Sequence, residues 1–169
     1  MAEPRRLLPT ALQMPATVRA GQVISLVEVT GGIGGKVDIP KLADELGDDI
    51  AVLLPILDGA EMLGLVRTEK GDLHLTELGL KFQKTSKNKV HMLKDRLAAI
   101  EPFRTALELA SRSKSIKASQ VSESLAEIGL KWHYQPEINE QLIKALLIHW
   151  AITGGLLSYD GKSGKFQKA

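Results

Sequence analysis

DIPKLADELGDDIAVLLPILDGAEMLGLVRTEKGDLHLTELG, residues 38–79, is the stretch that decides the fold of this chain. Its first apolar residues recur at three- and four-residue steps over residues 39–46, which predicts a short amphipathic helix. Asp38 is a favourable N-cap for this helix, and Gly47 can adopt the left-handed conformation that ends it. A second, broadly apolar helix is expected over residues 50–63, with acidic residues before it that favour its N-terminus.

A strand, a turn and a second strand follow the two helices. Residues 65–68 and 73–76 are short and rich in aliphatic or β-branched side chains, and the turn over residues 69–72 contains a glycine. Thr76 is placed to cap a further helix. Two short helices followed by a hairpin predict a winged helix-turn-helix, and we expect a short strand at residues 37–39 to join its sheet.

Length and composition limit the class of protein. The chain has 169 residues, of which 44% are hydrophobic, enough for one medium domain or two small ones. Cysteine is absent, which excludes disulfides and thiolate metal sites and fits a reducing compartment. The N-terminal segment lacks an apolar core of signal-peptide length, and the longest uncharged apolar run is too short to span a bilayer. We therefore expect a cytoplasmic protein that does not insert into a membrane.

The end of the chain repeats the plan of the opening stretch. A helix is expected over residues 136–152, after another over residues 116–129. Gly-Leu-Leu at residues 155–157 then matches Gly-Leu-Val at residues 64–66, and a glycine-containing turn follows in both places. Between the two copies, the apolar pattern over residues 81–110 predicts one long helix, kinked or divided at a proline.

The expected fold class is therefore mainly α with small β wings (α+β): tandem winged helix-turn-helix halves joined by a long helix. Residues 1–80 form the first half, with a proline-rich lead-in that packs through Leu7, Leu8 and Leu12, and a first helix over residues 18–30. Residues 81–169 form the long helix and the second half. A single winged helix followed by a helical extension is the alternative.

Over nearly its whole length the chain resembles the AAA-associated C-terminal domain found behind the nucleotide-binding domain of nitrate/sulfonate/bicarbonate-type ABC transporter ATPases. The resemblance rests on LLPILDGAEMLGLV at residues 53–66, on GDLHLTELG at residues 71–79, and on Trp150 followed by Tyr159-Asp160. It implies an accessory role beside a transporter ATPase. We expect the domain here without the ATPase domain, so that any nucleotide hydrolysis would belong to a partner chain.

No arrangement of residues in the sequence predicts catalysis. The glycine-rich loop over residues 30–37 lacks the first Gly and the final Ser or Thr of a P-loop. The four histidines are far apart, with no pair at helical spacing and no cysteine to complete a metal site. We expect a protein that is not an enzyme and that needs neither cofactor nor metal.

The helix expected to contact DNA in the first half is acidic rather than basic. It has Asp48, Asp49, Asp58 and Glu61 and no basic residue before Arg67. Acidic side chains near phosphates weaken binding to nucleic acid. We therefore interpret these four residues as a candidate surface for a protein partner, namely the ABC transporter ATPase.

The second half has the opposite charge. Residues 81–169 contain 15 Lys or Arg and 8 Asp or Glu, whereas residues 1–80 contain 7 and 12. The candidate basic surface consists of Lys81, Lys84, Lys87, Lys89, Lys94, Arg96, Lys114, Lys117, Lys162 and Lys165. It could follow a phosphate backbone, bind an acidic protein, or simply be a solvated face.

The leading hypothesis is a non-enzymatic accessory or regulatory winged-helix protein that binds the ATP-binding subunit of an ABC-type anion transporter. The alternative is a DNA-binding transcriptional regulator that uses the basic second half, with homodimer formation left open. An effector held in a groove between the halves is compatible with either hypothesis.

Overall fold

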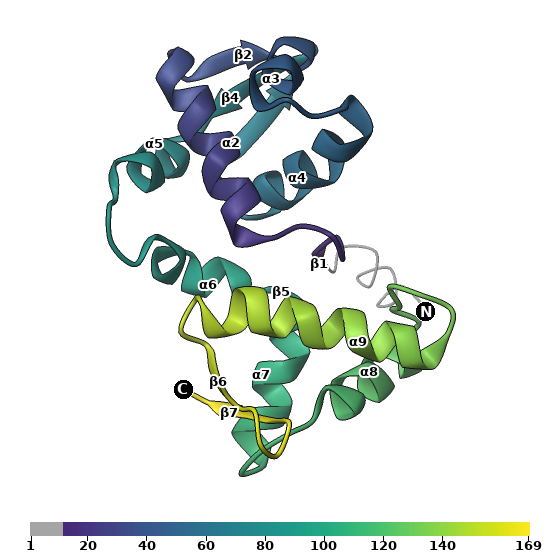
Figure 1. The fold of residues 1–169 in the computed structure, drawn as a ribbon. Coiled ribbons are helices and arrows are strands. Elements are labelled where there is room, and N and C mark those ends of the chain that lie inside the picture. The colour runs from purple at the N-terminus through teal and green to yellow at the C-terminus, as the bar shows by residue number, and fades with distance from the viewer. Residues whose placement is uncertain (1–11) are drawn as a thin grey trace, which may run out of the picture. The chain divides into compact units, whose positions relative to one another are not determined.

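The computed structural model describes residues 12–169, and in this range the protein is a mixed α/β chain in which helices predominate (Figure 1). The chain divides into an N-terminal unit, Thr17–Met92, and a C-terminal unit, Leu93–Ala169 together with residues 12–16 of the lead-in. The expected division at residue 80 falls inside α5 (Glu77–Lys84), which packs on α2 (Ala20–Ile33) of the N-terminal unit. The expected contacts of Leu7 and Leu8 lie outside the described residues.

The N-terminal unit packs four helices with a three-stranded sheet. Its strands have the order β2-β4-β3, and both pairings are antiparallel, with Val37 opposite Leu73 and Val66 opposite Leu75. Val37 and Leu73 are buried at the centre of this sheet. In chain order the unit contains α2 (Ala20–Ile33), β2 (Lys36–Asp38), α3 (Ile39–Leu46), α4 (Ile50–Met62), β3 (Val66–Glu69), β4 (Asp72–Leu75) and α5 (Glu77–Lys84).

Local sequence signals account for these boundaries. The Asp38 carboxylate accepts a hydrogen bond of 3.1 Å from the Lys41 backbone N–H, and Gly47 has a left-handed φ of 71°, as predicted for the two ends of α3. The Thr76 hydroxyl accepts from the Gly79 N–H at 3.0 Å, which confirms the expected cap of α5. Asp49 occupies the N-cap position of α4, but its side chain makes no capping hydrogen bond.

The helical pattern predicted over residues 81–110 is divided at Pro102, as expected, since Pro102 is the N-cap of α7, but the part before it is not one continuous helix. After α5 the chain forms a 3₁₀ turn, η2 (Lys89–Leu93), then α6 (Lys94–Leu97), β5 (Ile100–Glu101) and α7 (Phe103–Arg112). Asn88 has a φ of 54°, the left-handed conformation that interrupts a helix and that Asn tolerates better than most residues. The apolar residues of this region are buried through several short elements instead of one stripe.

The C-terminal unit begins with a strand taken from the lead-in. β1 (Leu12–Gln13) pairs in parallel with β5, and the Met14 side chain is fully buried. The indole Nε1 of Trp132 donates to the Met14 carbonyl at 2.6 Å. The rest of the unit contains α6, α7, α8 (Ala118–Glu127), α9 (Pro136–Leu146), the π-helical turn η3 (Leu147–Ile152), β6 (Leu157–Asp160) and β7 (Lys165–Lys168).

The two units share one order of elements. Each has a helix, an extended segment, two further helices and an antiparallel hairpin. In the C-terminal unit the extended segment is Ile116, whose backbone exchanges two hydrogen bonds of 2.8 and 2.7 Å with Phe166 of β7. The second strand of the hairpin is therefore the central one in both units, since β4 lies between β2 and β3.

Candidate binding surfaces

Helix α4 has an exposed side that is partly apolar. Its buried side includes Leu53 and Leu57, whereas Ile50 and Leu54, four residues apart on one face, are 39% and 48% exposed. The broad apolar pattern of this helix in the sequence indicates such exposed residues. A helix that is apolar on most of its sides is either buried all round or leaves some apolar side chains exposed.

Acidic side chains extend this exposed side. Leu54, Asp58 and Glu61 are spaced at three and four residues, so they form a row along one face of α4. Asp58, Glu61 and Asp49 are exposed, and Asp48 is half-buried. Within residues 12–169 none of these four carboxylates forms an ion pair. We call the set of Ile50, Leu54, Asp58 and Glu61 the α4 face.

The basic residues predicted to line one helix are distributed over several elements. Lys81, Lys84 and Lys87 are exposed on α5 and just after it, in the N-terminal unit. Lys89 belongs to the interior of that unit, because its side chain is only 12% exposed and its Nζ lies 3.1 Å from Glu28. Lys94 and Arg96 are exposed on α6, in the C-terminal unit.

The Lys89 ammonium also lies 5.1 Å from the centre of the Phe82 ring. A lysine held by a carboxylate and an aromatic ring in this way stabilises the fold and is not available to a ligand.

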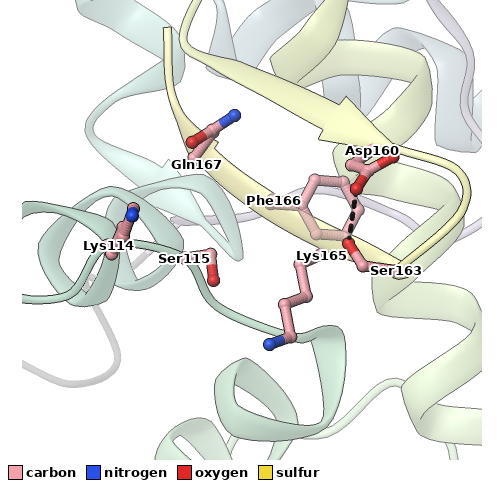
Figure 2. Close-up of a pocket in the computed structure, with 7 residues that line it drawn as sticks. All are labelled: Lys114, Ser115, Asp160, Ser163, Lys165, Phe166 and Gln167. Atoms are coloured by element: carbon pink, nitrogen blue, oxygen red, sulfur yellow. Dashed lines mark hydrogen bonds between the residues drawn. The ribbon is translucent and has the colours of Figure 1, made fainter.

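Two of the remaining lysines of the predicted basic surface, Lys114 and Lys165, line one pocket at the C-terminal hairpin. This pocket, of about 180 Å³, lies between the segment after α7 and the strands β6 and β7 (Figure 2). Lys114 and Ser115 come from that segment, and the hairpin contributes the other side chains. The full lining is Lys114, Ser115, Asp160, Ser163, Lys165, Phe166 and Gln167. We call this the hairpin pocket.

Strand register sets the chemistry around this pocket. Phe166 is fully buried, so its neighbours Lys165 and Gln167 point to the opposite, outer face of the sheet. Continuing the antiparallel pairing of Ile116 with Phe166 places Lys117 opposite Lys165. Two like charges directly opposite each other on a sheet repel.

The one carboxylate beside the pocket is already engaged by the hairpin turn. Asp160 accepts hydrogen bonds from the Ser163 hydroxyl at 2.8 Å and from the Lys162 backbone N–H at 3.1 Å. These hydrogen bonds, that from Ser163 first, lower the pKa of Asp160, so its carboxylate is ionised at neutral pH. Over the described residues, Lys114, Lys117, Lys162 and Lys165 form no ion pair.

A second, smaller pocket of about 120 Å³ lies at the connection between α8 and α9. Its base is the buried Asn139, whose side-chain oxygen accepts from the backbone N–H groups of Trp132 and His133 at 2.7 and 3.1 Å. The Asn139 amide donates to the Ser122 hydroxyl at 3.0 Å. These contacts use the polar groups of Asn139 to hold the loop, which indicates a structural role.

These features define a two-unit α/β protein with two exposed faces of different composition: an apolar and acidic one on α4 and a basic one at the C-terminal hairpin. In the described range no group of three or more His, Cys, Asp or Glu side chains could hold a metal ion. Nor does this range contain a helix that is both long and apolar enough to cross a membrane.

A family model described as the C-terminal AAA-associated domain matches residues 40–160. The match covers more than half of the chain and includes most of both units, so the chain belongs to this family, as its sequence motifs predict. No curated protein and no solved structure matches the chain.

Proposed function

We propose that this chain is a non-enzymatic accessory or regulatory domain that binds the ATP-binding subunit of an ABC-type anion transporter. Membership of the AAA-associated family supports an association with ATPases of this class. The chemistry of the exposed surfaces supports binding rather than catalysis. No step of nucleotide hydrolysis is assigned to this chain, and the partner supplies it.

We further propose that both units are winged helices. The support is the shared order of a helix, a strand, two helices and a hairpin, with the last strand at the centre of the sheet. In this interpretation α4 and α9 are the third helices, which many winged helices place in the major groove of DNA.

The observation that carries the proposed function is the α4 face. A DNA-contacting helix would need basic side chains facing phosphates, whereas α4 exposes Asp58 and Glu61 beside apolar Leu54. Helix α9 is similar in sign, since its exposed Glu137 and Glu140 are acidic. An apolar centre with a charged rim is the composition of a protein interface, so we assign α4 to the partner ATPase.

The test is capture of the partner from native lysate with the tagged full chain, at two salt concentrations and after nuclease treatment. Recovery of a subunit identified by mass spectrometry as an ATP-binding cassette protein supports the proposal, provided that Leu54→Asp abolishes recovery. Leu80→Asp is the matched control, because Leu80 is a similarly exposed leucine, at 42%, on α5 of the same unit. Equal loss with both variants would assign the effect to general surface chemistry and overturn the assignment of α4.

The alternative function, DNA binding by a transcriptional regulator, is favoured by the unpaired lysines of the C-terminal hairpin. In a winged helix the hairpin is the wing, and Lys162 and Lys165 there could contact phosphates. Recovery of DNA alone from the lysate, lost at higher salt, would support this alternative and refute the accessory role.

A further inference from the structure

The corresponding sheets of the two units have opposite charge on their outer faces. In the N-terminal unit, Asp38 lies opposite Asp72, and Asp72 lies opposite Glu69. At the equivalent positions of the C-terminal unit, Lys165 lies opposite Asp160, and extending the register of the Ile116–Phe166 bridge by one residue places Lys117 opposite Lys165. The equivalence follows from the pairing of Val37 with Leu73 and of Ile116 with Phe166.

The acidic row of the N-terminal unit has partners within its own sheet. Lys36 Nζ lies 3.8 Å from the Asp72 carboxylate, and His74 Nε2 lies 3.9 Å from Glu69. Asp38 is engaged as the cap of α3. Each acidic residue of this row therefore has a nitrogen donor of its own unit nearby.

The basic row of the C-terminal unit has a single acidic member, Asp160, which lies opposite Lys165 and already accepts hydrogen bonds from the hairpin turn. The positions equivalent to Lys36 and His74 are Ser115 and Gln167, which are neutral and cannot neutralise Lys117 or Lys165. Both neutral residues line the hairpin pocket, together with Lys114 and Ser163 (Figure 2). The pocket thus combines unpaired ammonium groups with hydroxyl and amide groups that can donate hydrogen bonds.

We propose that the hairpin pocket binds a small oxyanion of the phosphate or sulfate class. Lys114 and Lys165 supply charge within the pocket, Lys117 supplies charge beside it, and Ser115 and Gln167 donate hydrogen bonds to the anion. The anion relieves the repulsion between Lys117 and Lys165. The proposal does not depend on the partner bound by the α4 face.

The size of the pocket sets the size of the ligand. The pocket has a volume of about 180 Å³, well above the roughly 10–15 Å³ that a cavity needs to hold one water molecule. Sites for drug-sized ligands and cofactors occupy about 300–1,000 Å³. A single phosphate-sized anion with some of its water therefore fits, whereas a nucleotide would extend beyond the pocket.

The Asp160 carboxylate reduces the positive charge that the pocket presents to an anion. Its carboxylate opposes an incoming anion, but it is turned toward the Ser163 hydroxyl, as the dashed line in Figure 2 marks. Three ammonium groups against one carboxylate leave a positive balance around the pocket.

The experiment is a titration of the ¹⁵N-labelled full chain with inorganic phosphate at constant ionic strength, with chloride as the reference salt. Amide shifts that saturate at Ser115, Lys165 and Gln167 are the expected result. The N-terminal sheet is an internal control, because His74 and Asp72 occupy equivalent positions in a self-paired row and should not shift. Shifts of equal size in both units would overturn the proposal.

Variants test which groups make the site. Lys165→Gln should weaken phosphate binding by about tenfold, since a hydrogen bond to a charged group is lost. Gln167→Glu should have at least as large an effect, because it introduces an internal partner for the lysines as in the N-terminal unit. Lys131→Gln is the matched control, since this exposed lysine of the same unit lines the other pocket. Unchanged phosphate affinity in both Lys165→Gln and Gln167→Glu would refute the assignment.

A short DNA duplex, titrated in parallel, distinguishes a free anion from a phosphodiester backbone. Saturable binding of phosphate with no stronger binding of the duplex supports a small-ligand site. Binding of the duplex without any response to phosphate would overturn the proposal and assign the lysines to a polyanion.

Discussion

Truncation of Leu54 should weaken the complex with the partner ATPase. The size of the effect depends on how much of the Leu54 side chain is still exposed in the free protein and would be buried in the complex. Full burial of a leucine side chain stabilises by about 1.5–3 kcal/mol, and Leu54 already has about half of its surface covered. Covering the remainder contributes roughly 1 kcal/mol, so Leu54→Ala should raise Kd about fivefold. Leu54→Asp also leaves an unpaired carboxylate in a desolvated contact, which costs roughly 1–3 kcal/mol more and raises Kd by about 30- to 1,000-fold in total.

Isothermal titration of the purified ATP-binding subunit with each variant measures these changes. Because Leu54 is exposed in the free chain, its replacement should change the free energy of unfolding by no more than about 0.5 kcal/mol. Far-UV circular dichroism in urea checks this. Reversal of Asp58 and Glu61 to lysine should mainly slow association and alter its salt dependence, as expected for charges at the rim. If Leu54→Asp binds with the affinity of the unmodified chain, α4 is not the docking face.

Three further predictions concern the fold and the alternative function. Gly79→Ala should destabilise by about 1–3 kcal/mol, because a Cβ there would clash with the Leu65 carbonyl oxygen. Gly21→Ala, in a helix with no neighbouring atom within 4 Å of the new Cβ, should stabilise by about 0.5–1 kcal/mol. Urea unfolding measures both changes, and a sign opposite to the expected one would contradict the prediction for that residue. Glu101→Gln should lower the free energy of unfolding by about 1–3 kcal/mol in the same assay. The reason is that the buried carboxylate accepts from Arg104 at 2.7 Å and from the Thr105 N–H at 3.0 Å. An unchanged urea midpoint would show that these hydrogen bonds make no net contribution to stability. If the chain binds duplex DNA through α5, Lys84→Ala with Lys87→Ala should reduce the slope of log K against log salt by about 2, and an unchanged slope in a fluorescence-anisotropy titration excludes these lysines from the contact.

The N-terminal unit was largely predictable because its signals are local. The cap at Asp38, the stop at Gly47 and the hairpin glycine each act within a few residues, and α3, α4, β3 and β4 lie within one or two residues of their expected ends. The continuous helix expected between residue 81 and Pro102 is wrong for the opposite reason. Its apolar residues do recur with helical spacing, but Asn88 and the contacts of β5 with β1 interrupt it, and pairing with a distant strand has no signal in a local pattern.

The candidate surfaces show the same limit. The acidic residues of α4 could be identified from sequence because charge on one helix is a local property. The sequence could not show that Lys89 is unavailable to a ligand, because its partner Glu28 lies 61 residues earlier in the chain. The hairpin pocket also depends on a distant pairing, that of Ile116 with Phe166, which brings Lys114 and Ser115 beside the strand containing Lys165.

The charge reversal between the two sheets argues that the units have different ligands although they share one order of elements. If both units had retained a common ligand, the outer rows would have the same sign, and the positions beside them would have the same partners. Instead Lys36 and His74 pair the acidic row internally, whereas Ser115 and Gln167 leave the basic row open. A protein in which one unit docks on an ATPase and the other holds an anion could link the two events, because binding at one site would then alter affinity at the other by the same factor in both directions. The affinity of the ATPase measured with and without saturating phosphate would decide between linked and independent sites.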